Sequence, residues 1–197
     1  VEVARLLDEI GSLVGRSKEK LRSLRDRYSD RGVQRRWDRW YREAFEWSER
    51  HGNAALLVDK LNREVLLLQR GEVVRRYPID LGWNGLSDKL IQGDGATPEG
   101  KYRIAEKKGP EETRYYRALL IDYPNSENRS RFERALKSGA IPVDSRIGGM
   151  IELHGEGGRG EDWTDGCIAL RNPEMKSLYE VAYEGMPVTV VGRAPGE

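Results

Sequence analysis

Apolar residues recur at alternating steps of four and three along the first thirty positions of the chain. The repeat consists of Val3, Leu7, Ile10, Val14, Ser17, Leu21, Leu24 and Tyr28. This spacing places the side chains along one face of a long helix and is typical of a heptad seam. A glycine costs about 1 kcal/mol relative to alanine inside a helix. Because Gly11 and Gly15 both lie within the pattern, we expect this helix to need a packing partner.

A second helical pattern follows a turn signal at residues 29–32. The residues that share its apolar face are Trp37, Tyr41, Ala44 and Trp47. We therefore predict that residues 1–50 form a helical hairpin and that the first domain covers residues 1–52. The tryptophans are expected to fill the core of the hairpin or to dock on the next domain, rather than to bind a ligand.

Beyond His51 the pattern changes to short apolar runs separated by turn residues, which predicts β-strands. The expected strands cover residues 54–58, 65–68, 73–81, 101–105, 115–121, 150–154, 167–170 and 187–191. Two short helices are expected, namely residues 129–138 with Ser126 or Asn128 as the N-cap, and a helix capped by Asn172. Residues 53–197 are thus predicted to form a mainly β domain, and the whole chain an α+β protein.

The charge and the length of apolar stretches limit the classes of function. The chain of 197 residues has 34 lysines and arginines and 33 acidic residues, so its net charge of +1 gives no electrostatic reason to bind nucleic acid. No apolar stretch approaches the roughly 20 residues that cross a bilayer, so we expect no transmembrane segment. The first residue is neither an initiator methionine nor part of a signal peptide, which predicts a trimmed form.

Cys167 is the one cysteine of the chain, so neither an internal disulfide nor a cysteine-rich metal site is expected. A thiol with a pKa of roughly 8.5 is mostly protonated at neutral pH and needs a base or a positive partner to become a nucleophile. His154, at the end of one expected strand, could activate Cys167 at the start of another. Gly166 allows a tight turn that aims backbone amides at an oxyanion. A buried, inert cysteine is the alternative.

Acidic residues near His154 raise the alternative of a metal site. They are Glu152, Glu156, Asp162 and Asp165. We disfavour this alternative because the acids lie on an expected flexible loop and cysteine chemistry needs no metal ion, so neither a metal nor a cofactor is expected. The second histidine, His51, is expected to be a solvated linker residue.

Two separated parts of the chain resemble the L,D-transpeptidase (YkuD) catalytic domain. His154-Gly155 is followed, after a variable loop, by Thr-Asp-Gly-Cys-Ile-Ala-Leu-Arg-Asn at residues 164–172, which is similar to the signature of this family. The run Gly-Asp-Gly-Ala-Thr-Pro-Glu-Gly-Lys-Tyr-Arg-Ile at residues 93–104 resembles its upstream Thr-Pro-x-Gly segment. The resemblance covers about residues 53–192 and does not extend to the predicted hairpin.

The resemblance implies a β-sandwich-like fold and a cysteine-dependent acyltransferase that acts on the stem peptides of peptidoglycan. On this basis Cys167 is the nucleophile, His154 is the base, and the Gly155 carbonyl orients the imidazole. Gly166 and Cys167 would form the oxyanion hole. The attacked carbonyl belongs to an L-centre, typically of diaminopimelate, that is joined to D-alanine. Carbapenems trap the nucleophile in this family.

Four further residues near the cysteine are expected to bind substrate, namely Trp163, Thr164, Asp165 and Arg171. Trp163 is expected to act either as a lid that excludes water or as a packing anchor. Many family members have Ser-His where this chain has Thr164-Asp165, and an arginine where it has Ala169. An aspartate close to the thiol would raise the thiol pKa.

These departures resemble the periplasmic branch of the family, which implies an exported protein of the periplasm or cell envelope. The acceptor stays open: it is a neighbouring stem peptide, a lipoprotein lysine, or water, as in an L,D-carboxypeptidase or an amidase. A catalytically silent peptidoglycan-binding module is a further alternative. Retention of both His154 and Cys167 argues against it.

Overall fold

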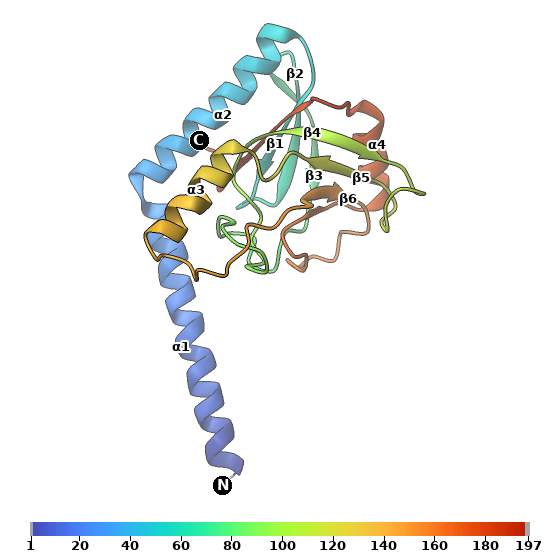
Figure 1. Cartoon of the computed structure of the whole chain (residues 1–197). Helices are drawn as coiled ribbons and strands as arrows, with labels where there is room; N and C mark the ends of the chain where they lie inside the picture. Colours follow the sequence, from blue (N-terminus) through green and yellow to red (C-terminus); the bar gives the residue numbers. More distant parts are fainter. Residues whose placement is uncertain (1, 196–197) are drawn as a thin grey trace. The chain divides into compact units, whose positions relative to one another are not determined.

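The computed structural model describes residues 2–195 and consists of two compact units, one ending at Arg36 and the other beginning at Trp37. Both predicted N-terminal helices are present (Figure 1), as α1 (Glu2–Ser29) and α2 (Arg31–His51). No helix in the described part of the chain is both long and apolar enough to cross a bilayer.

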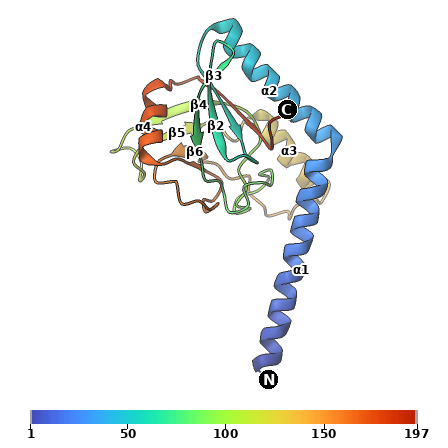
Figure 2. The ribbon, with the colours of Figure 1, turned by 180° about the vertical axis from the view of Figure 1, so that it is seen from behind.

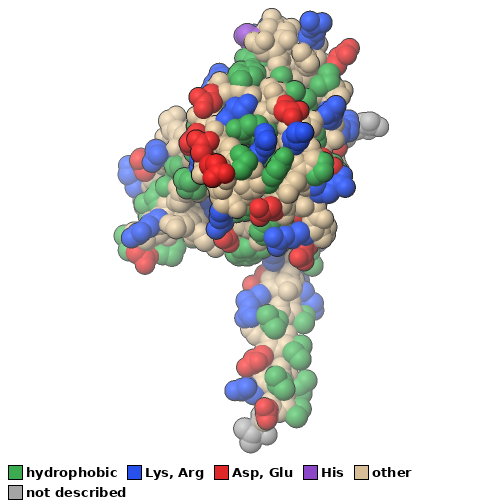
Figure 3. Space-filling view, turned by 90° about the vertical axis from the view of Figure 1, so that its right-hand side faces the viewer, with side chains coloured by type: hydrophobic (Ala, Val, Ile, Leu, Met, Phe, Trp, Pro, Cys, Tyr) green, Lys and Arg blue, Asp and Glu red, His purple; other side chains and the backbone are tan. Residues whose placement is uncertain are grey.

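The first unit is almost entirely α1. Hydrophobic side chains line one side of α1 and charged side chains line the other (Figure 3), as the heptad spacing predicts. Asp30 separates the two helices, and its side chain accepts a hydrogen bond from the Val33 backbone N–H at 2.8 Å. This aspartate therefore caps the first turn of α2.

The second unit is built on one mixed sheet of eight strands, which curls around its apolar core (Figures 1 and 2). The strands are β1 (Ala55–Asp59), β2 (Glu64–Gln69), β3 (Glu72–Pro78), β4 (Gly100–Lys108), β5 (Ala118–Ile121), β6 (Glu152–His154), β7 (Ile168–Ala169) and β8 (Pro187–Val191). Their order in the sheet is β3-β2-β1-β8-β4-β5-β6-β7. The pairs β1–β8 and β6–β7 are parallel, and the other pairs are antiparallel. The predicted α+β fold is confirmed, with the two layers of the sandwich contributed by a single curled sheet.

The two short helices are α3 (Ser126–Lys137) and α4 (Asn172–Val181), and both differ from the prediction in how they begin. Asn125, rather than Ser126 or Asn128, caps α3, and the Asn128 side chain completes a capping box. Asn172 is the first residue of α4 rather than its cap. Its side-chain oxygen accepts the Glu156 backbone N–H at 2.8 Å, which ties α4 to the loop after β6.

The second half of α2 packs within the same compact unit as the sheet. Its buried face carries Trp37, Trp40, Ala44 and Ser48. The Trp37 indole N–H donates to Glu99 at 2.7 Å, and Glu99 forms a buried ion pair with Lys60 at 3.0 Å. A Cβ atom on Gly192 would lie 2.2 Å from the Trp37 ring, so only glycine allows this close approach. The prediction that the tryptophans dock on the next domain is therefore confirmed for Trp37, and the compact unit begins within α2 rather than after it.

The Lys60–Glu99 pair connects α2 to the predicted Thr-Pro-x-Gly segment and, through it, to the turn that carries the cysteine. The Lys60 ammonium also donates to the Thr97 carbonyl at 2.8 Å. The Thr97 hydroxyl accepts the Gly82 backbone N–H at 3.2 Å. A Cβ atom on Gly82 would lie 3.0 Å from the backbone of Gly166, so these segments are closely packed.

Deletion of residues 1–52 should therefore lower the melting temperature far more than deletion of residues 1–29. Losing α2 removes the buried Trp37 and leaves the Lys60–Glu99 pair without its indole donor. Loss of a buried tryptophan costs about 3–5 kcal/mol, or roughly 10 °C for a domain of this size. Scanning calorimetry of the two shortened proteins beside the full chain measures the difference. Equal melting temperatures for the two would contradict the assignment of α2 to the second unit.

Candidate active site

The strands β6 and β7 place the predicted base and nucleophile side by side. The parallel register pairs Leu153 with Ile168 and His154 with Ala169. Leu153 and Ile168 both belong to the apolar core. Because side chains alternate along a strand, His154 lies on the opposite face from the core, and continuing the register by one position puts Cys167 on that same face. The thirteen-residue separation in sequence is thus bridged by one strand pairing.

His154 is fully buried and its ring is held on several sides. The Nδ1–H donates to the Gly155 carbonyl at 2.6 Å, as the family resemblance implies. The Tyr115 ring stacks on the imidazole at a centroid distance of 3.6 Å, and Trp163 approaches edge-on at 6.0 Å. Nε2 is buried without a hydrogen-bond partner among residues 2–195. This tautomer leaves the Nε2 lone pair available to accept a proton.

Both groups of the dyad are held in their neutral forms. Burial lowers the pKa of His154. Burial raises the pKa of the Cys167 thiol to about 11, and the Glu152 carboxylate acts in the same direction, whereas the Glu152 backbone N–H and the Arg114 charge oppose it. The thiol lies 3.5 Å from the Met150 carbonyl, to which it donates. The resting site therefore holds a thiol and a neutral imidazole rather than an ion pair, and the thiol must turn from Met150 to reach Nε2.

The acid whose charge raises the pKa of the Cys167 thiol is Glu152. Asp165 is exposed, and the largest influences on the pKa of Cys167 are burial, Glu152, Arg114 and Lys89. Glu152 is buried, lies level with Cys167 in the strand register, and shares its face. The spacing of two residues between Glu152 and His154 is a sequence signal that could have identified this acid.

The turn that carries Cys167 is fixed by Gly166 and Thr164. Gly166 has a φ of 128°, and a Cβ atom there would lie 2.6 Å from the Ala96 carbonyl. The Thr164 hydroxyl donates to the Cys167 carbonyl at 2.7 Å and accepts the Gly166 N–H at 3.2 Å. Of the two predicted oxyanion donors, Gly166 is thus already engaged, while the Cys167 N–H has no hydrogen-bond partner in the described chain. Thr164, which is predicted to bind substrate, also shapes this turn.

Asp80 organises the loop between His154 and Cys167, a role that the sequence did not reveal. It is buried, and its carboxylate accepts hydrogen bonds from three consecutive backbone amides and from the Trp163 indole. The donors are Gly158 N at 2.8 Å, Arg159 N at 2.9 Å, Gly160 N at 3.3 Å and Trp163 Nε1 at 3.2 Å. The Arg159 guanidinium lies 3.5 Å from the centroid of the Trp163 ring. Trp163 is therefore held against His154, an arrangement that fits the packing anchor among its two predicted roles.

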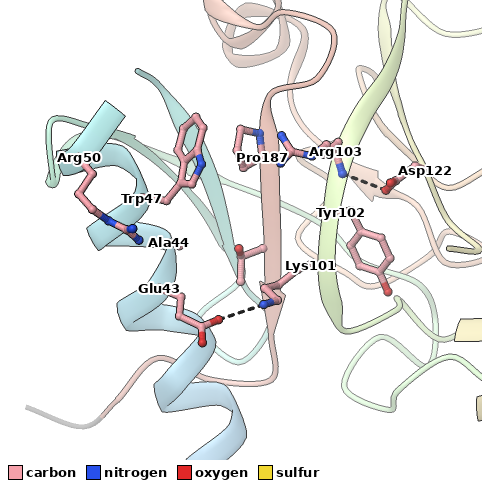
Figure 4. Close-up of a pocket in the computed structure, with 10 residues that line it drawn as sticks. Glu43, Ala44, Trp47, Arg50, Lys101, Tyr102, Arg103, Asp122 and Pro187 are labelled. Atoms are coloured by element: carbon pink, nitrogen blue, oxygen red, sulfur yellow. Dashed lines mark hydrogen bonds and ion pairs between the residues drawn. The ribbon is translucent and has the colours of Figure 1, made fainter. Parts of the chain in front are cut away.

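A cavity of about 330 Å³ opens beside the thiol. Besides Cys167 it is lined by Lys108, Glu112, Thr113, Arg114, Tyr115, Met150 and Glu152. Neither Asp165 nor Arg171 lines it, and Arg171 pairs with Glu174 at the start of α4. A second groove, of about 500 Å³, runs between α2 and the strands β4 and β8, where Glu43 pairs with Lys101 (Figure 4). That groove contains neither member of the dyad.

Across residues 2–195, no three side chains of His, Cys, Asp or Glu come together as ligands for a metal ion.

A sequence profile of the L,D-transpeptidase catalytic domain (YkuD) matches residues 53–190. The chain belongs to this family. The matched region contains both members of the dyad, the Gly166 turn and the segment around Thr97, so the family's shared sequence coincides with the elements that build the site.

The relatives of this L,D-transpeptidase family member are distant. YafK of Escherichia coli strain K12, a proposed L,D-transpeptidase, is 24% identical over 120 residues, which are 61% of this chain and 42% of YafK. The helical cell shape determining protein Pgp2 from Campylobacter jejuni is 26% identical, with a TM-score of 0.52 over 73% of this chain and 49% of Pgp2. Bd1075 from Bdellovibrio bacteriovorus shares the fold at 23% identity, with a TM-score of 0.54 over 73% of this chain and 49% of Bd1075. The chain thus spans about half the length of the solved relatives, and less of YafK.

The raised pKa of Cys167 predicts slow alkylation of the free L,D-transpeptidase domain. With a thiol pKa of about 11 instead of 9.0, the thiolate fraction at pH 8 falls about 100-fold. Alkylation by iodoacetamide should therefore keep rising through pH 9 without a plateau, as followed by mass spectrometry. The same protein unfolded in guanidinium chloride, where burial is lost, should react at the rate of an ordinary thiol. A plateau near pH 7 in the folded protein would show a thiolate–imidazolium pair instead.

Proposed function

We propose that the chain is a cysteine-dependent L,D-transpeptidase that acts on peptidoglycan stem peptides through a thioester acyl-enzyme. The observation that carries this proposal is that Cys167 and His154 share one face of the β6–β7 pair, where Nε2 has no hydrogen-bond partner in the described chain and the thiol lines a cavity. Family membership over residues 53–190 supports the reaction class. We infer that residues 53–197 carry the chemistry, with α2 as their structural support.

Acylation begins with transfer of the Cys167 proton to Nε2 of the neutral His154 as sulfur attacks the carbonyl of the L-centre. A C–S bond forms, and the carbonyl oxygen becomes an oxyanion that accepts a hydrogen bond from the Cys167 backbone N–H. The C–N bond to D-alanine then breaks, and His154 returns the proton to the leaving nitrogen. The products are a thioester on Cys167 and free D-alanine.

Deacylation transfers the acyl group to an amine of a neighbouring stem peptide or of a lipoprotein lysine. The amine gives its proton to His154 as it attacks the thioester, and the proton then restores the Cys167 thiol. Water in place of the amine would release a shortened peptide and make the chain an L,D-carboxypeptidase or an amidase. The likeness to Pgp2, named for its part in determining cell shape, supports a role in cell shape. We infer a location in the periplasm or cell envelope from the proposed peptidoglycan substrate.

Mass spectrometry of the products from a purified tetrapeptide muropeptide tests the proposal. We expect a cross-linked dimer and free D-alanine, neither of which forms with the Cys167→Ala protein. A tripeptide without any dimer would assign water as the acceptor. An unchanged substrate, from a protein that melts as a folded domain, would contradict the proposed function.

A further inference from the structure

We propose that Arg114 binds the free carboxylate of the terminal D-alanine, and so restricts the protein to stem peptides that end at the residue to be released. This assignment rests on the proposed function, because it gives the leaving group a place in the cavity beside Cys167. It deepens that function by naming the chemical group that selects the substrate.

Arg114 lies beside the cavity into which the Cys167 thiol opens. It lines the same cavity as Cys167, in the segment that precedes β5. Its guanidinium donates to the Tyr115 hydroxyl at 2.6 Å and lies 4.8 Å from the centroid of that ring. The Tyr115 ring in turn stacks on His154 at 3.6 Å. The guanidinium is therefore held beside the ring that covers the catalytic base, and its charge reaches the thiol, where it opposes the rise in the pKa of Cys167.

The other charged groups of the cavity are already engaged. Lys108 pairs with Glu152 at 2.8 Å and with Glu106 at 3.8 Å. Glu112 accepts the Gly109 backbone N–H at 2.9 Å. Arg114 has no carboxylate within ion-pair distance in the part of the chain that the structure describes. It is thus the cavity's cation that lacks an anion from the protein.

The chemistry of the leaving group fixes where an anion must lie. His154 returns a proton to the nitrogen of D-alanine, and the carboxylate carbon lies two bonds, about 2.5 Å, from that nitrogen. The carboxylate therefore lies close to the imidazole and its Tyr115 cover, within the neighbourhood of the guanidinium. Ala169, which pairs with His154 in the sheet, supplies no charge there. A guanidinium binds a carboxylate through two parallel hydrogen bonds, which a C-terminal amide cannot accept in the same way.

Calorimetric titration of the full-length Cys167→Ala protein tests the assignment without any need for turnover. Two ligands are compared, a stem tetrapeptide that ends in D-alanine and the same peptide ending in D-alaninamide. We expect the carboxylate form to bind about 10- to 100-fold more tightly, since charge-assisted hydrogen bonds are lost with the amide. Adding Arg114→Gln should reduce this ratio to near one and leave amide binding within about twofold. Arg134→Gln removes the same charge from an exposed position on α3 and should preserve the ratio.

The outcomes separate the assignment from the proposed function. Equal affinities for the two peptides in the Cys167→Ala protein would overturn the role of Arg114. Loss of affinity for the amide peptide as well as for the carboxylate peptide in the Arg114→Gln variant would also overturn it. Arg114→Lys keeps the charge without the planar fork and should retain part of the preference. If the wild type turns over neither peptide but the preference for the carboxylate depends on Arg114, the binding assignment stands and the proposed reaction fails.

Discussion

Replacement of Cys167 by alanine should abolish the covalent adduct that a carbapenem forms with the wild-type protein. Intact-protein mass spectrometry should show one adduct per wild-type chain, because the chain has a single thiol and it lies at the cavity. An alanine side chain has no nucleophilic atom, so no acyl adduct can form at position 167. The substitution removes only one sulfur atom from a partly exposed position, so the fold should be retained.

Asp165→Asn is the matched control for this experiment. Asp165 lies two positions before Cys167, yet its side chain is exposed and does not line the cavity beside the thiol. The rate of adduct formation should therefore stay within about twofold of the wild type. An adduct on the alanine variant would place the acylation site elsewhere, and a large effect of Asp165→Asn would show that its carboxylate approaches the thiol.

The sequence predicted the elements of the fold well because their signals are local. The heptad spacing identified α1, and short apolar runs between turn residues identified the strands, since each pattern lies within a single element. The caps were less accurate, with Asn125 replacing Ser126 or Asn128, because neighbouring polar residues compete for the same backbone amides. The dyad was found because a resemblance joined two segments that one strand pairing brings together.

The residues that surround the dyad could not be predicted in this way. Asp80 reaches the loop after His154 from 78 to 80 positions away along the chain. Trp37 and Glu99 are separated by 62 positions, and their hydrogen bond ties α2 to the second unit. Tyr115 was expected in a strand, but β5 begins at Ala118, which leaves the tyrosine ring to cover the imidazole. Each of these contacts joins segments that are far apart in the sequence and that meet only when the curled sheet forms. The sequence of one segment alone therefore does not predict them.

Replacement of His154 should remove turnover while the thiol remains. The imidazole is fully buried against Tyr115, so alanine would leave a cavity and lower stability. Glutamine fills more of this space and cannot act as a base, which makes His154→Gln the sharper variant. Loss of general base catalysis should lower the rate of acylation by roughly 10²–10⁴-fold. Circular dichroism and melting curves check that the variant is folded.

The pH dependence of acylation tests whether His154 is the base. Burial lowers the pKa of His154, so the imidazole stays neutral at pH 7 and becomes protonated only at a pH below its ordinary value of 6.5. A protonated imidazole cannot accept the thiol proton, so acylation by the wild type should be constant around neutral pH and fall on the acid side below pH 6.5. His154→Gln should lose this acid limb and show instead a rate that rises with pH as the thiolate fraction grows. Stopped-flow measurement of carbapenem acylation from pH 4.5 to pH 9 compares the two profiles. A variant with near wild-type rate, or one that keeps the acid limb, would assign the base to another group.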